Sequence, residues 1–381
     1  MIPLNSNIMK LQRSGIRRFT NLARETPDCV MLTIGEPDFE TPQPIRDAAW
    51  AALQAGQTHY APNQGIPTLR KAIADFETRR GFPCAPEQVL VTVGATGALY
   101  TALTGLLNPG DEVVIPTPAF SLYESIALAA GAVPVPLDLS QTGFQIDERA
   151  LAAVLTPRTR AVILNSPNNP TGVVLNDDSL AAVKRAVLGK PIRLICDNVY
   201  QQLSEGNCPD LSLDPELREQ VLLCQSFSKP YAMTGWRAGY LIGPQEVMDR
   251  LLLLHAAEVA AVPTFIQTAC VTALAVDPAP MAAVYAKRRG EVCRRLDEMG
   301  LTYPKPRGAF YVFPDISRFG LDSETFCTRM IREAKVAAVP GSCFGTDGYI
   351  RLSCCYADEA LWTGLDRLEQ FLGSLKGGLS R

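Results

Sequence analysis

The most constraining feature of the sequence is a regular alternation, between residues 45 and 280, of short apolar runs with Ala- and Leu-rich helical stretches. The runs are VLVTV 89–93, EVVIP 112–116, VPVPL 133–137, AVILN 161–165, RLICD 193–197, VLLCQ 221–225 and GYLIG 239–243. Such alternation is typical of a wound α/β sheet, and runs that are apolar throughout indicate strands covered on both faces. We therefore predict an α/β fold with a mostly parallel sheet and helices on both faces.

The two chain ends lack this alternation. The strand-like segments FYVFP 310–314 and YIRLS 349–353 are followed by an amphipathic helical pattern from Asp358 onward. A chain of 381 residues suits a large domain plus a smaller one. We predict a large domain at residues 45–284 and a small α+β domain formed by residues 1–44 and 285–381.

Composition excludes several classes of protein. A net charge of -3, with no basic run, argues against a nucleic-acid partner. The apolar region 251–284 is interrupted by polar residues, which favours buried helices over a membrane span. The eleven cysteines include no C-x-x-C pair, so neither a disulfide framework nor a metal site is predicted. With no signal-peptide pattern in the first residues, we expect a cytoplasmic protein.

Four of the predicted strands end in residues that carry chemistry. The segment GATGALYTAL follows VLVTV, and SPNNPTG follows AVILN. After RLIC comes DNVY, and after VLLCQ comes SFSKPYAMTGWRAGY. Ligands of open parallel sheets bind beyond the carboxyl ends of the strands. A Gly-containing turn that enters a helix would also suit a phosphate.

Each of these segments is a weak signal by itself. Asp197 alone is more often a helix cap, and Lys229 alone is more often a solvated lysine, although Pro230 favours an extended backbone there. Arg237 and Arg351 alone are more often surface ion-pair partners. One wound sheet, however, would bring an anion-binding turn, an amide, an acid and a lysine to the same edge, which unrelated local roles explain poorly.

These motifs, from GEPDFETP at 35–42 through GATGAL, NSPNNPTG, DNVY and SFSKPYAMTGWRAGY to YIRLS, resemble the class I and II aminotransferases. This family comprises aspartate-aminotransferase-like pyridoxal-phosphate enzymes of fold type I. The resemblance covers nearly the whole chain. It implies a transaminase that moves the amino group of an L-amino acid to a 2-oxo acid, with pyridoxal 5'-phosphate as cofactor.

The resemblance assigns the central roles. Lys229 would hold the cofactor as an imine and later carry a proton, which requires its pKa to lie below the usual value of about 10.4. Asp197 would keep the pyridine nitrogen protonated, so that the ring acts as an electron sink. Tyr200 and Asn169 would hydrogen-bond the ring's phenolic oxygen, and Phe120 would stack on the ring, where the family often has a larger aromatic residue.

The resemblance also implies a phosphate site and a dimer. The phosphate would be bound by Ala95, Thr96, Ser226, Ser228 and Arg237, which supply neutral donors and one planar cation. In the family, the residue that matches Tyr60 reaches the phosphate from the other subunit. We therefore expect a homodimer with shared active sites.

For the substrate, Arg351 matches the arginine that binds the α-carboxylate as a bidentate fork, a contact of roughly 1.5–3 kcal/mol. Gly35 would add a backbone contact, and Asn169 would lie at the substrate as well as at the cofactor. Some relatives that use acidic amino acids have a lysine in place of Thr96, so a dicarboxylate preference does not follow.

Two alternatives remain open. A carbon–sulfur β-lyase on the same scaffold would use the same lysine, aspartate and arginine, and a catalytically silent relative could act as a regulatory module. The roles of four further residues also stay open. Arg17 and Arg18 could meet a distal substrate carboxylate or form a solvated basic face, while His59 and His255 could simply be packed.

Overall fold

The computed structural model describes residue 2 and residues 4–378, and its largest sheet has seven strands in the order β2-β8-β7-β6-β5-β3-β4. They are β2 (Val89–Thr92), β3 (Glu112–Thr117), β4 (Val133–Asp138), β5 (Thr159–Asn165), β6 (Arg193–Asp197), β7 (Val221–Ser226) and β8 (Gly239–Ile242). Each predicted apolar run contributes one of these strands. β8 is antiparallel to both of its neighbours and the other pairs are parallel, which confirms the prediction of a mostly parallel sheet.

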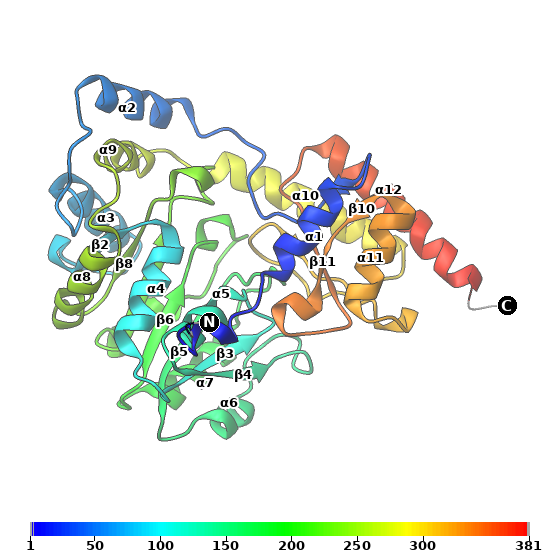
Figure 1. Cartoon of the computed structure of the whole chain (residues 1–381), viewed down its shortest axis with the longest axis horizontal. Coiled ribbons are helices and arrows are strands. Elements are labelled where there is room, and N and C mark those ends of the chain that lie inside the picture. Colours follow the sequence, from blue (N-terminus) through cyan, green and yellow to red (C-terminus); the bar gives the residue numbers. More distant parts are fainter. Residues whose placement is uncertain (1, 3, 379–381) are drawn as a thin grey trace.

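Helices cover both faces of this sheet (Figure 1). One face packs against α4 (Gly94–Leu106), α5 (Leu122–Ala129) and α8 (Gln245–Val259). The other packs against α2 (Gln43–Gln54), α3 (Pro67–Arg79), α6 (Glu148–Val154), α7 (Asp177–Val187) and α9 (Thr264–Ala273). In β2, Leu90 enters the first core while Val89 and Val91 enter the second. Because successive strand residues point to opposite faces, a strand buried on both sides is apolar throughout.

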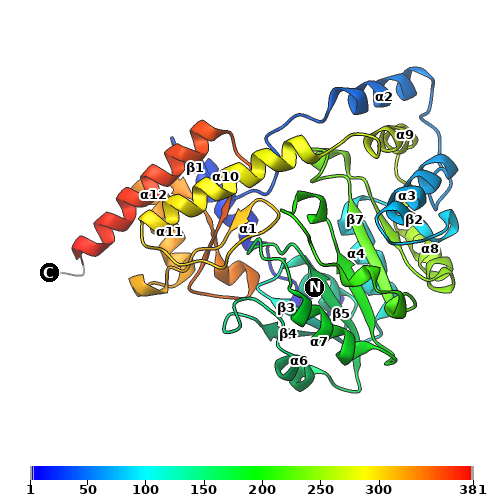
Figure 2. The ribbon, with the colours of Figure 1, turned by 180° about the vertical axis from the view of Figure 1, so that it is seen from behind.

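Segments from the two chain ends form a second body of structure beside the large sheet (Figure 2). Its elements are α1 (Gly15–Arg24), β1 (Val30–Met31), α10 (Ala279–Glu298), β9 (Tyr311–Val312), α11 (Ser323–Ala334), β10 (Val336–Ala337), β11 (Val339–Pro340), β12 (Ile350–Ser353) and α12 (Asp358–Gly378). β1 pairs with β10, and β11, β12 and β9 form a three-stranded sheet. Phe19 and Leu32 from one chain end share a core with Phe326 and Leu365 from the other. The predicted α/β fold with a smaller α+β part is confirmed.

The exact domain boundary stays a prediction, because residue 284 falls inside α10, a continuous helix of 20 residues. The apolar region 251–284 forms parts of α8, α9 and α10 rather than one long helix. Within the described residues, no helix combines the length and the apolar character that crossing a membrane requires.

Candidate active site

The carboxyl ends of three neighbouring strands lie side by side at one edge of the large sheet. Asn165, which ends β5, is in register with Asp197, which ends β6, and Ser226 ends β7 next to them. The Asn165 side chain donates to the Asp197 carbonyl at 2.9 Å and accepts from the backbone N–H of Asn169 at 2.9 Å. One buried amide therefore fixes two of the predicted site residues, Asn169 and Asp197, relative to each other.

The turn that opens α4 and the start of β8 meet at the same edge. Gly239 pairs with the last residues of both β2 and β7. A Cβ at Gly239 would lie 2.6 Å from the carbonyl carbon of Gly94 and 2.8 Å from the nitrogen of Ala95. A Cβ at Gly94 would lie 2.9 Å from Nη2 of Arg237. These two glycines therefore let the guanidinium and the N-terminus of α4 approach each other closely.

Hydrogen-bond donors gather around this helix N-terminus. The backbone N–H of Ser228 donates to Oγ of Ser226 at 3.0 Å, and both residues are buried. Arg237 is exposed, donates to the Thr234 carbonyl at 2.8 Å and forms no ion pair with any described residue. Thr96 is exposed in the first turn of α4. Free helix N–H groups, hydroxyls and one unpaired cation together suit a phosphate.

Lys229 lies three residues beyond the end of β7, and its Nζ donates to the carbonyl of Gly35 at 2.7 Å. Burial lowers the pKa of Lys229 to about 8, although the Cys355 thiol and the Glu36 carboxylate act in the opposite direction. Because the ammonium form is disfavoured, an appreciable fraction of this amine is neutral near neutral pH. A neutral amine is the form that can act as a nucleophile or accept a proton.

Asp197 is a buried carboxylate with one oxygen bonded and the other free. The hydroxyl of Tyr123, on α5, donates to Oδ2 at 2.6 Å, while Oδ1 is buried without a partner among the described residues. Burial raises the pKa of Asp197 to about 6, and the Tyr123 hydrogen bond and the charge of Lys229 limit the rise. An unpartnered buried carboxylate oxygen is unfavourable, so this atom suits a donor from a bound group.

Arg351, on β12, is a buried guanidinium that has no carboxylate partner in the described part of the chain. It donates from Nη1 to Oδ1 of Asn169 at 2.8 Å and from Nη2 to the carbonyl of Thr33, and its Nε has no partner. The rings of Tyr311 and Phe344 lie 4.5 and 4.9 Å from its carbon Cζ. A buried cation held by neutral acceptors and aromatic faces is suited to an anionic ligand.

Tyr200 is three residues beyond Asp197, and its hydroxyl lies 2.9 Å from the hydroxyl of Tyr311. Burial raises the pKa of both phenols, so both are protonated at neutral pH. A Cβ at Gly35 would lie 1.8 Å from the Tyr311 hydroxyl oxygen. Tyr311 therefore leaves no room for a side chain at Gly35, the residue whose carbonyl accepts from Lys229.

Two predicted aromatic residues, Tyr60 and Phe120, lie at the margin of this cluster. Tyr60 is 96% exposed, which leaves its ring free of the rest of the chain. Phe120 packs edge-on against Tyr123, with ring centroids 6.0 Å apart. Because the Tyr123 hydroxyl donates to Asp197, only the ring of Tyr123 separates Phe120 from that carboxylate. Ala95 is half-buried at the start of α4.

The four residues whose roles the sequence leaves open differ in their surroundings: Arg17, Arg18 and His59 are exposed, and His255 is buried. Arg18 forms a surface ion pair with Glu324 at 2.6 Å, and Arg17 beside it is exposed. His59 is exposed and contributes only its carbonyl, which accepts from a threonine of α9. His255 is buried in α8, and burial lowers its pKa, as expected of a packed neutral histidine.

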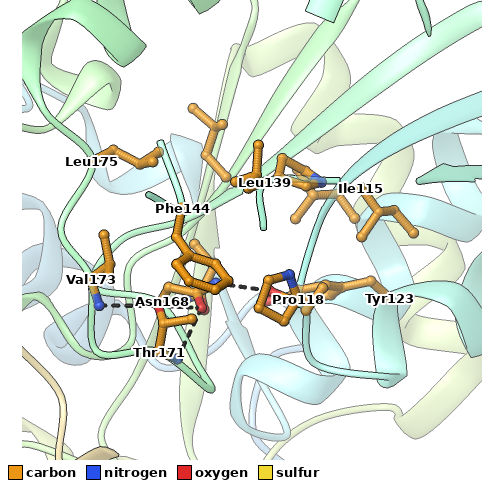
Figure 3. Close-up of a pocket in the computed structure, with 14 residues that line it drawn as sticks. Ile115, Pro118, Tyr123, Leu139, Phe144, Asn168, Thr171, Val173 and Leu175 are labelled. Atoms are coloured by element: carbon orange, nitrogen blue, oxygen red, sulfur yellow. Dashed lines mark hydrogen bonds between the residues drawn. The ribbon is translucent and has the colours of Figure 1, made fainter. Parts of the chain in front are cut away.

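A cavity of about 30 Å³ lies beside the site and is lined mainly by apolar side chains (Figure 3). Phe144, Leu139 and Leu175 lie on one side of it, and the amide of Asn168 borders it near Pro118. This volume holds about one or two water molecules and is far below the several hundred Å³ that a small-molecule site occupies. The cavity is therefore a neighbour of the site, not the place of its ligand.

Several residues of this cluster are not identified from the sequence, among them Asn165, Tyr123 and Tyr311. Asn165 ends a predicted strand, which was a usable signal. Tyr123 and Tyr311 reach the cluster from a helix and from the far chain end, and no local pattern distinguishes them from core aromatics.

Comparison with known proteins agrees with this arrangement. The family model for aminotransferase class I and II matches residues 27–368. The chain is 38% identical to a protein of Bacillus subtilis (strain 168) named as a probable N-acetyl-LL-diaminopimelate aminotransferase, over 97% of this chain and 95% of the other. It is also 38% identical to aromatic-amino-acid aminotransferase 2 of Thermococcus litoralis, over 98% of this chain and 99% of the other.

The chain therefore belongs to the class I and II aminotransferases. The structure of the aspartate aminotransferase from Thermus thermophilus with maleate superposes with a TM-score of 0.92, at 34% identity, over 97% of this chain and 100% of the other. The predicted family is confirmed, and so is the predicted reaction class, the transfer of an amino group.

Proposed function

We propose that the chain binds pyridoxal 5'-phosphate at the sheet edge and uses it to transfer the amino group of an L-amino acid to a 2-oxo acid. The observation that carries this proposal is the free, buried Oδ1 of Asp197, on the strand next to the one that leads into Lys229. Asp197 would accept from the protonated ring nitrogen, and Lys229, whose pKa is about 8, would be the amine that holds the cofactor. When bound, the cofactor supplies an electron-withdrawing ring that acidifies the substrate's α-carbon.

The residues around the two central groups fit the remaining parts of the cofactor. The phosphate would be held by Ala95, Thr96, Ser226, Ser228 and Arg237. Tyr200 and Asn169 would donate to the ring's phenolic oxygen, and Phe120 would cover the ring face. Lys229 would then move a proton from the substrate α-carbon, a role that its lowered pKa favours.

Arg351 would bind the substrate's α-carboxylate, with Gly35 and Asn169 beside it. Its burial without an acidic partner supports this role, because an incoming carboxylate would compensate the charge. Amino acids and 2-oxo acids share an α-carboxylate. One arginine can therefore serve both the donor and the acceptor.

For the donor side chain, we propose an aromatic or acidic amino acid, with 2-oxoglutarate or pyruvate as acceptor. Relatives named for aromatic amino acids and for aspartate support both donor classes. Position 96 carries a neutral threonine, so the side-chain carboxylate of an acidic substrate would have to bind a cationic residue at another position.

We also propose a cytoplasmic homodimer in which Tyr60 of one protomer reaches the phosphate of the other. The 96% exposure of Tyr60, an aromatic side chain, supports a surface that a second copy covers. Mixing K229A with Y60A protein tests this arrangement. Hybrid dimers should regain one complete site and activity, whereas a mixture no more active than its parents would contradict site sharing.

The decisive test of the function is a half-reaction. The purified chain, loaded with the cofactor, is mixed with single L-amino acids without any 2-oxo acid, and the absorbance of the bound cofactor is followed. We expect conversion to the amino form of the cofactor with release of one equivalent of 2-oxo acid. Release of ammonia and pyruvate from cystathionine, with the starting spectrum regained, would instead identify a β-lyase.

A further inference from the structure

Tyr311 occupies a central place among the residues described above, although it has no assigned role. It is 2% exposed, on β9, and its ring lies 4.5 Å from the guanidinium carbon of Arg351. Its hydroxyl lies 2.9 Å from that of Tyr200. The same hydroxyl fills the space that any side chain at Gly35 would need. One side chain thus contacts a residue proposed for the cofactor and two proposed for the substrate carboxylate.

Either hydroxyl could donate the hydrogen bond that joins the two phenols, and both phenols are protonated at neutral pH. Burial is the main cause that raises the pKa of Tyr311, and the charge of Arg351 limits the rise to about 12. Burial raises the pKa of Tyr200 well above its ordinary value, and Tyr311 adds to that rise. Each phenol has a single proton to donate, so Tyr200 can donate to only one acceptor. When Tyr200 donates that proton to the phenolic oxygen of the cofactor, Tyr311 must be the donor of the bond between the two phenols.

We propose that Tyr311 is a positioning residue that links the carboxylate-binding Arg351 to the hydroxyl of Tyr200. Its hydroxyl orients Tyr200 toward the phenolic oxygen of the cofactor ring, and its ring supports the guanidinium from one face. This inference rests on the proposed function, since it concerns how the chain's own residues meet that cofactor. Donation by Tyr311 makes Tyr200 a stronger donor, because hydrogen bonds in a chain polarise one another.

Two substitutions separate the two contacts of Tyr311. Y311F removes the hydroxyl but keeps the ring beside Arg351, while Y311L removes both. Y303F is the matched control, because the Tyr303 hydroxyl bonds only the Cys293 carbonyl, at 3.1 Å, and Asp297, at 2.9 Å. Neither of those residues contacts the site.

The first measurement is a pH titration of the absorbance of the bound cofactor. In Y311F, Tyr200 becomes a weaker donor, so the phenolic oxygen becomes more basic. We expect the apparent pKa of the bound cofactor to rise by roughly half to one pH unit, the effect of about one hydrogen bond. Y303F should titrate like the wild type. An unchanged titration in Y311F, with full cofactor content, would overturn the link to Tyr200.

The second measurement separates KM from kcat for one amino acid. Y311F should leave KM within about twofold of the wild type, because the ring stays in place. Y311L should raise KM by a further factor of roughly 3 to 30, the usual range for a partly desolvated cation–π contact. Equal KM values in Y311F and Y311L would overturn the support of Arg351 by the ring.

The third measurement uses the cofactor-free chain and so does not depend on the proposed function. Denaturant midpoints of the wild type, Y200F, Y311F and the double variant form a cycle that isolates the contact between the two hydroxyls. The shift caused by Y311F should shrink by at least half when position 200 is already phenylalanine. Equal shifts in both backgrounds would overturn the contact. If the wild type bound no pyridoxal phosphate, the proposed function would fail while this cycle still decided the contact.

Discussion

The two halves of the candidate site differ in how their polar groups are held. In the sheet-edge half, Asp197 and Lys229 stand at the ends of adjacent parallel strands, fixed by side chains such as Asn165 and Tyr123. In the carboxylate half, Arg351 is held by Asn169 and by the carbonyl of Thr33, which lie 182 and 318 residues before it in the sequence. In the sheet-edge half, one oxygen atom of Asp197 has no hydrogen-bond partner among the described residues. In the carboxylate half, the guanidinium of Arg351 has no acidic partner among them.

This difference indicates what each half is for. A single free acceptor atom suits a group that stays bound and supplies one donor. An unpaired buried cation is costly by itself and becomes favourable only when an anion arrives. We therefore expect substitutions in the sheet-edge half to affect cofactor chemistry, and substitutions at Arg351 to affect mainly substrate affinity.

The largest expected effect is in the sheet-edge half. K229A removes the amine with the lowered pKa, so we expect amino-group transfer to fall by roughly 10⁴-fold or more. The absorbance that marks covalent attachment of the cofactor should also be lost. Stopped-flow spectroscopy and a coupled assay measure these two quantities. A variant that keeps either one near wild-type level would mean that the chemistry does not depend on this half.

Asp197 gives the next largest effect, as a dependence of stability on pH. Its pKa is raised to about 6, so the folded chain favours the protonated form. The stabilisation is fully present below the unfolded value of 3.8 and is lost as pH rises through about 6. Relative to D197N, the unfolding free energy of the cofactor-free wild type should fall by roughly 2–2.5 kcal/mol between pH 4 and pH 7. If chemical denaturation gave parallel pH curves for the two proteins, the pKa of Asp197 would not be raised in the folded chain.

Arg351 tests the other half. R351K keeps the charge but loses the planar fork, so KM for the amino acid should rise roughly 10- to 100-fold while kcat changes less. R351M removes the unpaired charge, and we expect it to raise the unfolding free energy of the cofactor-free chain by about 1–2 kcal/mol. Steady-state kinetics and chemical denaturation measure these effects. A drop in kcat with constant KM would place Arg351 with the sheet-edge half instead.

The same difference explains what could be predicted from the sequence. The seven strands and the gathering of Asn165, Asp197 and Ser226 follow from apolar runs and from the rule that parallel strand ends share an edge. Two partners of Arg351 could not be predicted this way, because Thr33 comes from the other chain end and Tyr311 meets Arg351 through the pairing of β9 with β12. Resemblance to a family identified the arginine, but the contacts of Tyr123 and Tyr311 required the three-dimensional structure.

The smallest expected effect refines the picture of the sheet-edge half. Y123F removes the hydroxyl that donates to Oδ2 of Asp197 at 2.6 Å, a bond that favours the ionised carboxylate. The midpoint of the pH dependence described for Asp197 should therefore move upward by roughly half to one pH unit. The same pH series on R351M should run parallel to that of the wild type, since guanidinium groups stay protonated throughout this range. If Y123F left the midpoint unchanged, the Tyr123 hydroxyl would not stabilise the ionised carboxylate, and the pKa of Asp197 would depend on burial and on its other neighbours, such as Lys229.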